Sequence, residues 1–130
     1  VDPCYVEVKF DSRTPVMATK ENCQDAAEKT AHAHGFDFET PGMIPPHRVA
    51  ADSEFVQKLL RAYEQVTGLK GEAMAIGGGT YVHDIKNGVA FGAVLPGIDT
   101  HMHGADEFFD LENIVLATKV YAEAIIELCS

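Results

Sequence analysis

A short segment rich in proline and glycine divides the chain into two parts. Residues 40–47 read TPGMIPPH, with three prolines and one glycine among eight residues. Proline fixes the backbone angle φ and lacks the amide donor that helices and sheets use, and the residue before it avoids helical geometry. Neither a helix nor a paired strand runs easily through such a segment. We therefore expect an irregular, extended crossing between a short first part and a longer second part.

The first part alternates between strand and helix patterns. In Tyr5–Phe10 apolar side chains alternate with charged ones, which indicates a half-buried strand. Thr19 as a cap and Gly35 as a stop bound a helical repeat, and residues 36–39 alternate again. A strand–helix–strand (βαβ) unit is therefore predicted over about residues 4–40. Such a unit is too small to bury both faces of a sheet alone.

The second part predicts two helices and two short strands. Asp52 and Gly68 bound the first helix, and Asp110 caps the last one. Residues 73–76 and 89–95 are apolar runs typical of buried strands. The apolar stripes expected on the two helices are Phe55, Val56, Leu59, Leu60, Tyr63 and Val66, and Ile114, Ala117, Tyr121, Ile125 and Leu128. The whole pattern predicts an α/β fold.

Charge and cysteine content exclude several classes of protein. Twenty acidic against ten basic side chains give a formal net charge of −10, which disfavours nucleic-acid binding. The apolar runs are much shorter than the roughly 20 residues that span a membrane. The cysteines, Cys4, Cys23 and Cys129, are odd in number and form no CxxC pair. Reduced thiols and a cytoplasmic location are therefore expected.

The segment 98–109 is the first candidate for chemistry. It holds two imidazoles and three carboxylates between a predicted strand and a predicted helix: Asp99, His101, His103, Asp106 and Glu107. Zinc favours imidazole nitrogen and carboxylate oxygen, so this loop is a candidate metal site. If the loop is extended, His101 and His103 point to opposite sides, and only one of them is a ligand. The alternative is a solvated polar loop.

Two further features are suited to binding an anion. Residues 77–79 are three consecutive glycines after a predicted strand, and such a turn lets backbone amides approach a carboxylate closely. The alternative is a tight turn that packing requires. Arg13, in the sequence DSRTP, is suited to bidentate carboxylate recognition, although a lone arginine is also a common surface charge.

These features occur in an order that resembles a known enzyme family. The motifs are DSRTP at 11–15, IGGGTY at 76–81, AFG at 90–92, LPG at 95–97 and MHGADE at 102–107. Together they resemble the C-terminal end of the co-catalytic zinc metallopeptidases, the family of aminoacylases and carboxypeptidase-G-like enzymes. The GGGTY and DxRxP forms are most similar to the peptidase-V-like dipeptidases. The resemblance covers about Tyr5 to Leu128.

The resemblance implies a division of the chain and a metal ligand. Residues 1–46 would be the C-terminal part of a lid domain, a βαβ half of a ferredoxin-like fold, and residues 47–130 the C-terminal part of the catalytic domain. His103 would be a ligand of one of two zinc ions. Glu107 matches the acidic residue of the same motif, and Asp106 stands where the family usually has asparagine.

The resemblance also implies a substrate-binding set. Arg13 would bind the terminal carboxylate of a small peptide, with Gly78 and Gly79 contributing backbone contacts. His83 stands where the dipeptidases commonly have an arginine. The family's general base and its other metal ligands lie upstream of these motifs, so no catalytic residue is assigned in this chain.

The leading hypothesis is therefore a C-terminal fragment of a zinc-dependent dipeptidase that hydrolyses small peptides with a free C-terminal carboxylate. We expect the fragment to be inactive without the remaining N-terminal part of the same enzyme, and we expect no nucleic-acid or membrane partner. The alternative is a noncatalytic module that binds a carboxylate or a metal. A third hypothesis is a structural remnant whose motifs serve only packing.

Overall fold

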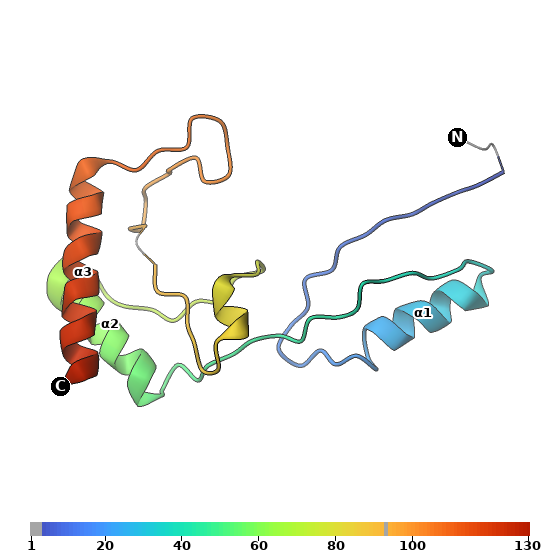
Figure 1. Cartoon of the computed structure of the whole chain (residues 1–130), viewed down its shortest axis with the longest axis horizontal. Coiled ribbons are helices and arrows are strands. Elements are labelled where there is room, and N and C mark those ends of the chain that lie inside the picture. The colour runs from blue at the N-terminus through green and yellow to red at the C-terminus, as the bar shows by residue number, and fades with distance from the viewer. Residues whose placement is uncertain (1–3, 93) are drawn as a thin grey trace. The chain divides into compact units, whose positions relative to one another are not determined.

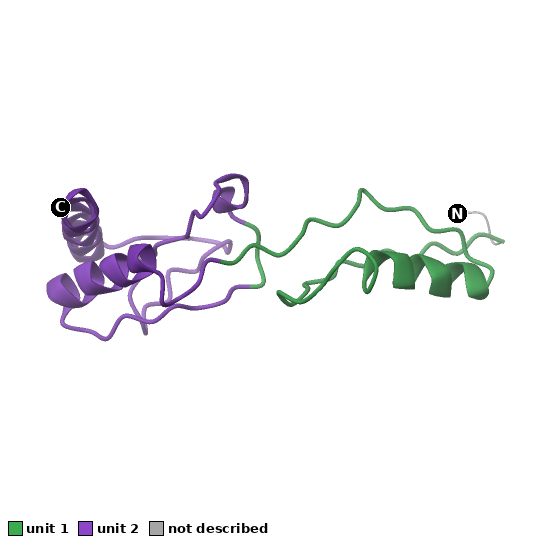
Figure 2. Ribbon diagram, turned by 90° about the horizontal axis from the view of Figure 1, so that it is seen from below, with its two compact units in different colours: residues 1–48, 77–79 green, residues 49–76, 80–130 purple. Residues whose placement is uncertain are grey.

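The computed structural model describes residues 4–92 and 94–130. In this part of the chain α1 spans Gln24–Ala33, α2 spans Glu54–Thr67, α3 spans Leu111–Cys129, and the short 3₁₀ helix η1 spans Tyr81–Asp84 (Figure 1). The chain divides into two compact units (Figure 2). One is Val1–Arg48 with Gly77–Gly79, and the other is Val49–Ile76 with Thr80–Ser130. That residues 1–46 and 47–130 belong to a lid and a catalytic domain stays a prediction.

The predicted α/β fold, with its βαβ unit, is wrong. Across residues 4–92 and 94–130 the structure has helices, turns and irregular segments but no β-strand. The segments predicted as strands are 5–10, 36–39, 73–76 and 89–95, of which Ala93 lies outside the described residues. Alternating side chains indicate which way residues point, but a strand exists only where its backbone pairs with a neighbour. Val6 and Val8 are 70% and 71% exposed, so no second layer covers this segment.

Helix α1 begins later than predicted. Thr19 does not cap it: the Thr19 hydroxyl accepts a hydrogen bond from the Asn22 amide at 3.3 Å, and the Asn22 side chain accepts one from the Thr19 amide at 2.7 Å. These bonds close a turn ahead of the helix, which starts at Gln24. Gly35 is confirmed at the far end, with a left-handed φ of 78° and an amide bonded to the His32 carbonyl.

The turn before α1 carries two charged surface residues whose pKa values are shifted. Lys20 bonds to the Asp25 carboxylate, and this contact raises the pKa of the lysine. Hydrogen bonds from its own backbone amide and from Thr19 lower the pKa of Glu21. Because Lys20 and Glu21 are exposed, these contacts add little to stability.

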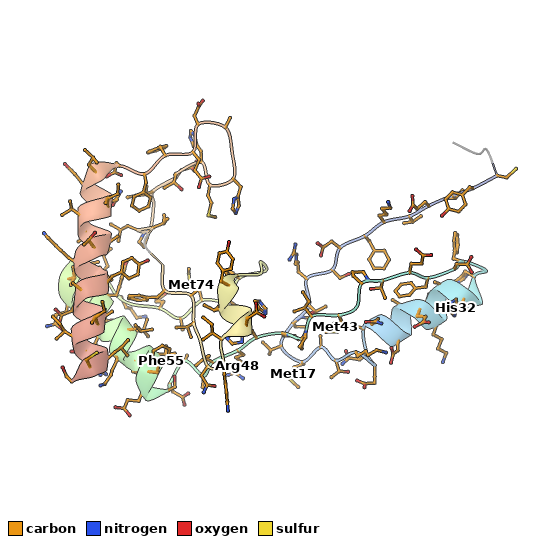
Figure 3. The ribbon with its side chains drawn as sticks, in the orientation of Figure 1. Met17, His32, Met43, Arg48, Phe55 and Met74 are labelled. Atoms are coloured by element: carbon orange, nitrogen blue, oxygen red, sulfur yellow. The ribbon has the colours of Figure 1, made fainter. Side chains whose placement is uncertain are left out.

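The segment 40–47 contains neither helix nor strand, as predicted. It is tied to α1 by one hydrogen bond, in which the Gln24 side chain accepts from the Met43 amide at 3.0 Å. Met43 is labelled beside α1 in Figure 3. The proline-rich crossing is thus irregular in shape but anchored to its own unit.

Helix α2 is bounded by local signals. Ser53, and not the predicted Asp52, is the cap, and its hydroxyl accepts from the Val56 amide at 3.4 Å. Both residue types serve as caps, so the sequence alone did not separate these neighbours. The predicted end at Gly68 is confirmed: its φ is 70° and its amide bonds to the Glu64 carbonyl.

The core of the second unit lies between α2 and α3. Leu59 and Ala62 of α2 pack against Ala124 of α3, and the half-buried Val89 and Phe91 cover this cluster. The predicted α2 stripe is confirmed at Val56 and Leu59, which are buried, and in part at the half-buried Leu60, Tyr63 and Val66. Phe55 stays 37% exposed at the start of the helix, where Figure 3 labels it.

Two polar contacts join the same helices at their surface. Arg61 on α2 lies 3.6 Å from the Glu127 carboxylate on α3. The Lys58 ammonium donates to the Ser130 carbonyl at 3.1 Å. Both contacts link residues far apart in sequence, so they hold the helix pair in one register.

The cap of α3 was predicted correctly and its buried face was not. The Asp110 side chain accepts from the Asn113 amide at 2.8 Å. The buried residues are Asn113, Val120 and Ala124, whereas the predicted Ile125 is 63% exposed. Outside one stripe of charged residues, Glu112, Lys119, Glu123 and Glu127, most of α3 is apolar, so the apolar pattern does not single out the face that packs on α2. Within the described residues no helix is both long and apolar enough to cross a lipid bilayer.

Candidate functional site

The predicted metal loop is a closed and ordered turn. Its ends are joined by a hydrogen bond of 3.1 Å from the Phe108 amide to the Thr100 carbonyl. Thr100 is only 7% exposed. The ring of His101 meets the ring of Phe108 edge-on, with centroids 5.6 Å apart. The loop is therefore held by its own side chains and backbone.

Three residues of this loop adopt the left-handed backbone conformation. The φ angles are 54° at His101, 62° at His103 and 57° at Asp106. Asparagine, aspartate and histidine tolerate this region better than most residues, and branched side chains do not. The loop is therefore not extended, and the argument that His101 and His103 point to opposite sides does not apply.

Two of the loop carboxylates bind backbone amides. Asp99 accepts from the His101 amide at 2.9 Å, and Glu107 accepts from the His103 amide at 3.3 Å. The Gly104 amide bonds to the His101 carbonyl at 2.7 Å, and a Cβ atom at Gly104 would lie 2.9 Å from that same oxygen. The carboxylates thus support the shape of the turn, and glycine is required where it tightens.

The residues present do not make a zinc site by themselves. A structural or catalytic zinc ion takes three or four protein ligands. Among residues 4–92 and 94–130, no three His, Cys, Asp or Glu side chains are grouped so that they could hold a metal. The sequence placed five candidate ligands in one loop, but the structure does not gather them. The assignment of His103 as a ligand stays a prediction.

The predicted carboxylate-binding residues Arg13 and the glycine turn lie together in the first unit. A Cβ atom at Gly77 would be 3.8 Å from Cγ of Arg13. The Arg13 guanidinium donates through Nη2 to the Asp11 carboxylate at 3.1 Å. Both residues belong to the DSRTP motif, but the sequence analysis did not predict this contact. One side chain oxygen of Asp11 is engaged, and both residues are exposed.

Neighbouring atoms do not explain why residues 78 and 79 are glycines. A Cβ atom at either position would meet no described atom within 4 Å. Neither residue has a left-handed φ. The tight-turn alternative therefore receives no support from packing within the described part of the chain.

His83 lies in η1, in the second unit. The Thr80 side chain accepts from the Val82 amide at 3.4 Å, and the Thr80 carbonyl accepts from the His83 amide at 3.2 Å. The predicted substrate-binding residues are thus divided between units: Arg13, Gly78 and Gly79 in the first, and His83 in the second.

Comparison with known proteins identifies the family. The model of peptidase family M20/M25/M40 matches residues 4–127. The chain therefore belongs to this peptidase family, which confirms the resemblance seen in the motifs. No solved structure matches the chain.

Two curated relatives show how much of a family protein this chain represents. It is 42% identical over 101 residues to "Putative dipeptidase SH1171" of Staphylococcus haemolyticus, covering 78% of this chain and 22% of that protein. It is 35% identical over 122 residues to "Putative dipeptidase YtjP" of Bacillus subtilis, covering 94% and 26%. The chain spans about a quarter of the length of these relatives.

Proposed function

We propose that this chain is the C-terminal part of a cytoplasmic dipeptidase of the M20 family, and that its first unit binds the carboxylate end of a small peptide. Membership of a peptidase family and relatives named as dipeptidases support this class of reaction. A dipeptidase must recognise both ends of a short substrate, so a dedicated carboxylate site is expected in it.

The observation that carries the proposal is the proximity of Arg13 to the glycine turn. The side chain of Arg13 lies against Gly77, and the two following residues have no side chain to hinder a ligand. A guanidinium offers five donors and binds carboxylates through two parallel hydrogen bonds. Asp11 occupies Nη2 through one contact and leaves other donors of Arg13 for a substrate.

His103 is proposed as one ligand of a zinc centre with two ions. The described residues supply no complete ligand set, so the remaining ligands and the general base would come from the part of the longer protein that precedes these residues. The substrate-binding role of His83 is likewise proposed. No catalytic group is assigned within the chain.

The test uses the longer protein that contains this chain. Its hydrolysis of a dipeptide with a free carboxylate is compared with hydrolysis of the same dipeptide as a C-terminal amide. For Arg13→Gln we expect kcat/KM on the free dipeptide to fall about 10- to 1,000-fold, as for the loss of a charged hydrogen-bond pair. The amide should be affected much less, because it lacks the charge that Arg13 recognises.

Lys9→Gln is the matched control. It also removes one positive charge from an exposed side chain of the same unit, where Lys9 pairs with Glu7 at 3.2 Å. We expect its kcat/KM to stay near that of the unchanged protein. Equal losses in the two variants, or equal losses on both substrates, would contradict the carboxylate-binding role. If the longer protein without any substitution binds dipeptides but does not hydrolyse them, the result would favour a noncatalytic binding module.

A further inference from the structure

Asn87 and Gly88 form an asparagine–glycine pair in a tight turn of the second unit. The turn spans residues 85–88 and is closed by a hydrogen bond of 2.9 Å from the Gly88 amide to the Ile85 carbonyl. It joins η1, which ends at Asp84, to the segment that covers the core. An asparagine before a glycine is chemically labile, because glycine has no side chain to keep its backbone nitrogen away from the neighbouring amide group.

The shape of the turn requires both residues of this pair. Asn87 has a left-handed φ of 60°, a region that asparagine tolerates better than most residues. At Gly88 a Cβ atom would lie 2.9 Å from Cβ of Ile85 and 3.1 Å from its carbonyl oxygen. Atoms do not approach so closely without strain, so a larger residue at position 88 would distort the turn. The labile pair is therefore a consequence of the turn geometry.

Asn87 is also the asparagine that its surroundings restrain least. The chain has three asparagines, and only Asn87 precedes a glycine. Its side chain is exposed and has no hydrogen bond to any other described residue. The Asn22 side chain binds two backbone groups, at 3.2 Å and 2.7 Å. Asn113 is 9% exposed, lies in α3 and donates to the Asp110 side chain.

We propose that Asn87 is a site of spontaneous deamidation in this protein. The backbone nitrogen of Gly88 gives up its proton and attacks the side chain carbonyl carbon of Asn87. A carbon–nitrogen bond forms and the bond to the side chain nitrogen breaks. Ammonia leaves with the proton that came from Gly88, and a cyclic imide remains. Water then opens the imide at either carbonyl carbon and gives aspartate or isoaspartate, so the reaction consumes one water and involves no oxidation.

The hydrogen bond of the turn slows this reaction without preventing it. The Gly88 nitrogen cannot attack while its hydrogen is shared with the Ile85 carbonyl, so the turn has to open first. One ordinary hydrogen bond changes such an equilibrium by a factor of about two to ten. Residues 85–87 are all exposed, and exposed turns open at low cost.

The two products differ in what they do to the backbone. Aspartate adds one negative charge to a chain whose formal net charge is −10 and leaves the backbone unchanged. Isoaspartate routes the backbone through the side chain and lengthens it just before Val89 and Phe91, which cover the core. The Phe91 carbonyl also accepts from the Tyr121 hydroxyl of α3 at 3.1 Å. We expect isoaspartate to loosen this segment from α3, and aspartate to leave it in place.

The test follows deamidation in the longer protein that contains this chain, kept folded in mildly alkaline buffer. Peptic digestion in acid halts the reaction, and mass spectrometry then gives the rate at each of the three asparagines. We expect Asn87 to react at least about tenfold faster than Asn22 or Asn113. In guanidinium chloride Asn87 should react about two- to tenfold faster than in the folded protein, because the hydrogen bond of the turn is lost.

Two results would overturn the proposal. One is a rate at Asn87 in the folded protein that is no higher than the rates at the other two asparagines. The other is a folded rate of about one-hundredth of the denatured rate or less, since the turn would then prevent the reaction. Asn87→Gly is the matched control, because glycine accepts the left-handed φ and has no side chain amide to lose. It should abolish the mass change in the peptide that contains position 87.

Hydrogen–deuterium exchange tests the effect on the backbone. Residues 89–91 should exchange at least about threefold faster in aged protein that contains isoaspartate than in Asn87→Asp, which has the same charge and an unchanged backbone. Equal exchange would contradict the loosening of this segment. None of these readouts depends on catalysis, so a longer protein that hydrolyses no dipeptide would refute the proposed function and still allow this test.

Discussion

Truncation of Leu59 is the sharpest test of how the second unit is held together. Leu59 is 5% exposed and packs with Ala62 and Ala124, which are small. Leu59→Ala removes three carbon atoms from this contact, worth about 2.4 kcal/mol at 0.8 kcal/mol per buried carbon group. A residual cavity adds to this loss, so we expect the free energy of unfolding to fall by about 3 kcal/mol.

The comparison residue for Leu59 is Ile125, a side chain of equal size on the partner helix. Because Ile125 is 63% exposed, Ile125→Ala should change the stability of the chain alone by no more than about 0.5 kcal/mol. Urea unfolding followed by helical circular dichroism measures both variants. Two outcomes would refute the assignment of the core to the α2–α3 contact. One is an equal loss of unfolding free energy in the two variants, and the other is a loss below about 1 kcal/mol for Leu59→Ala.

Two further predictions concern the loop before α3. Gly104→Ala should disturb the turn, because its Cβ would lie 2.9 Å from the His101 carbonyl oxygen. Amide chemical shifts across residues 100–108 measure this change. Gly92→Ala is the control, because no described atom lies within 4 Å of the added carbon. The chain alone should bind zinc far more weakly than closed structural sites, which bind with about 10–16 kcal/mol. Calorimetry that shows tight stoichiometric binding surviving His103→Ala would contradict the ligand assignment.

The C-terminal ends of α1 and α2 and the start of α3 were predictable because their signals are local, whereas the start of α1 was not. Gly35 and Gly68 both adopt a left-handed φ directly after a helix, and Asp110 accepts from the amide three residues on. Each signal depends on one residue and its nearest neighbours, so it survives whatever the rest of the chain does. The cap of α2 was predicted at Asp52 and is Ser53, an error of one position in the placement of a side-chain cap.

Strand pairing and the buried face of α3 depend on residues far away in the sequence and could not be predicted from local signals. Alternation in 5–10 describes side chains only, and no sequence pattern states whether a backbone partner lies alongside. The buried face of α3 was misassigned because Val120 and Ile125 are equally apolar, and only the position of α2 distinguishes them. A helix with one apolar stripe, such as α2, does not present this ambiguity.

In the candidate site, too, features that depend on neighbouring residues were easier to predict than those that depend on the folded backbone. Arg13 lies near the glycine turn, and the substrate-binding role of both stays a prediction. The sequence predicted irregular backbone over residues 98–109, and the structure has turns there, but the hydrogen bonds within the loop were not foreseen. Left-handed geometry at His101 and His103 changes where every later side chain points, and sequence spacing assumes a regular backbone.

The left-handed residues of the loop also bear on what maintains its shape. Each costs about 1–2 kcal/mol relative to ordinary backbone, and the hydrogen bonds and the ring contact within the loop offset this cost. Its far end runs directly into Asp110 and α3, whose position depends on packing against α2. One end of the loop, a few residues beyond His103, is therefore fixed by the same helix pair that forms the core of the second unit.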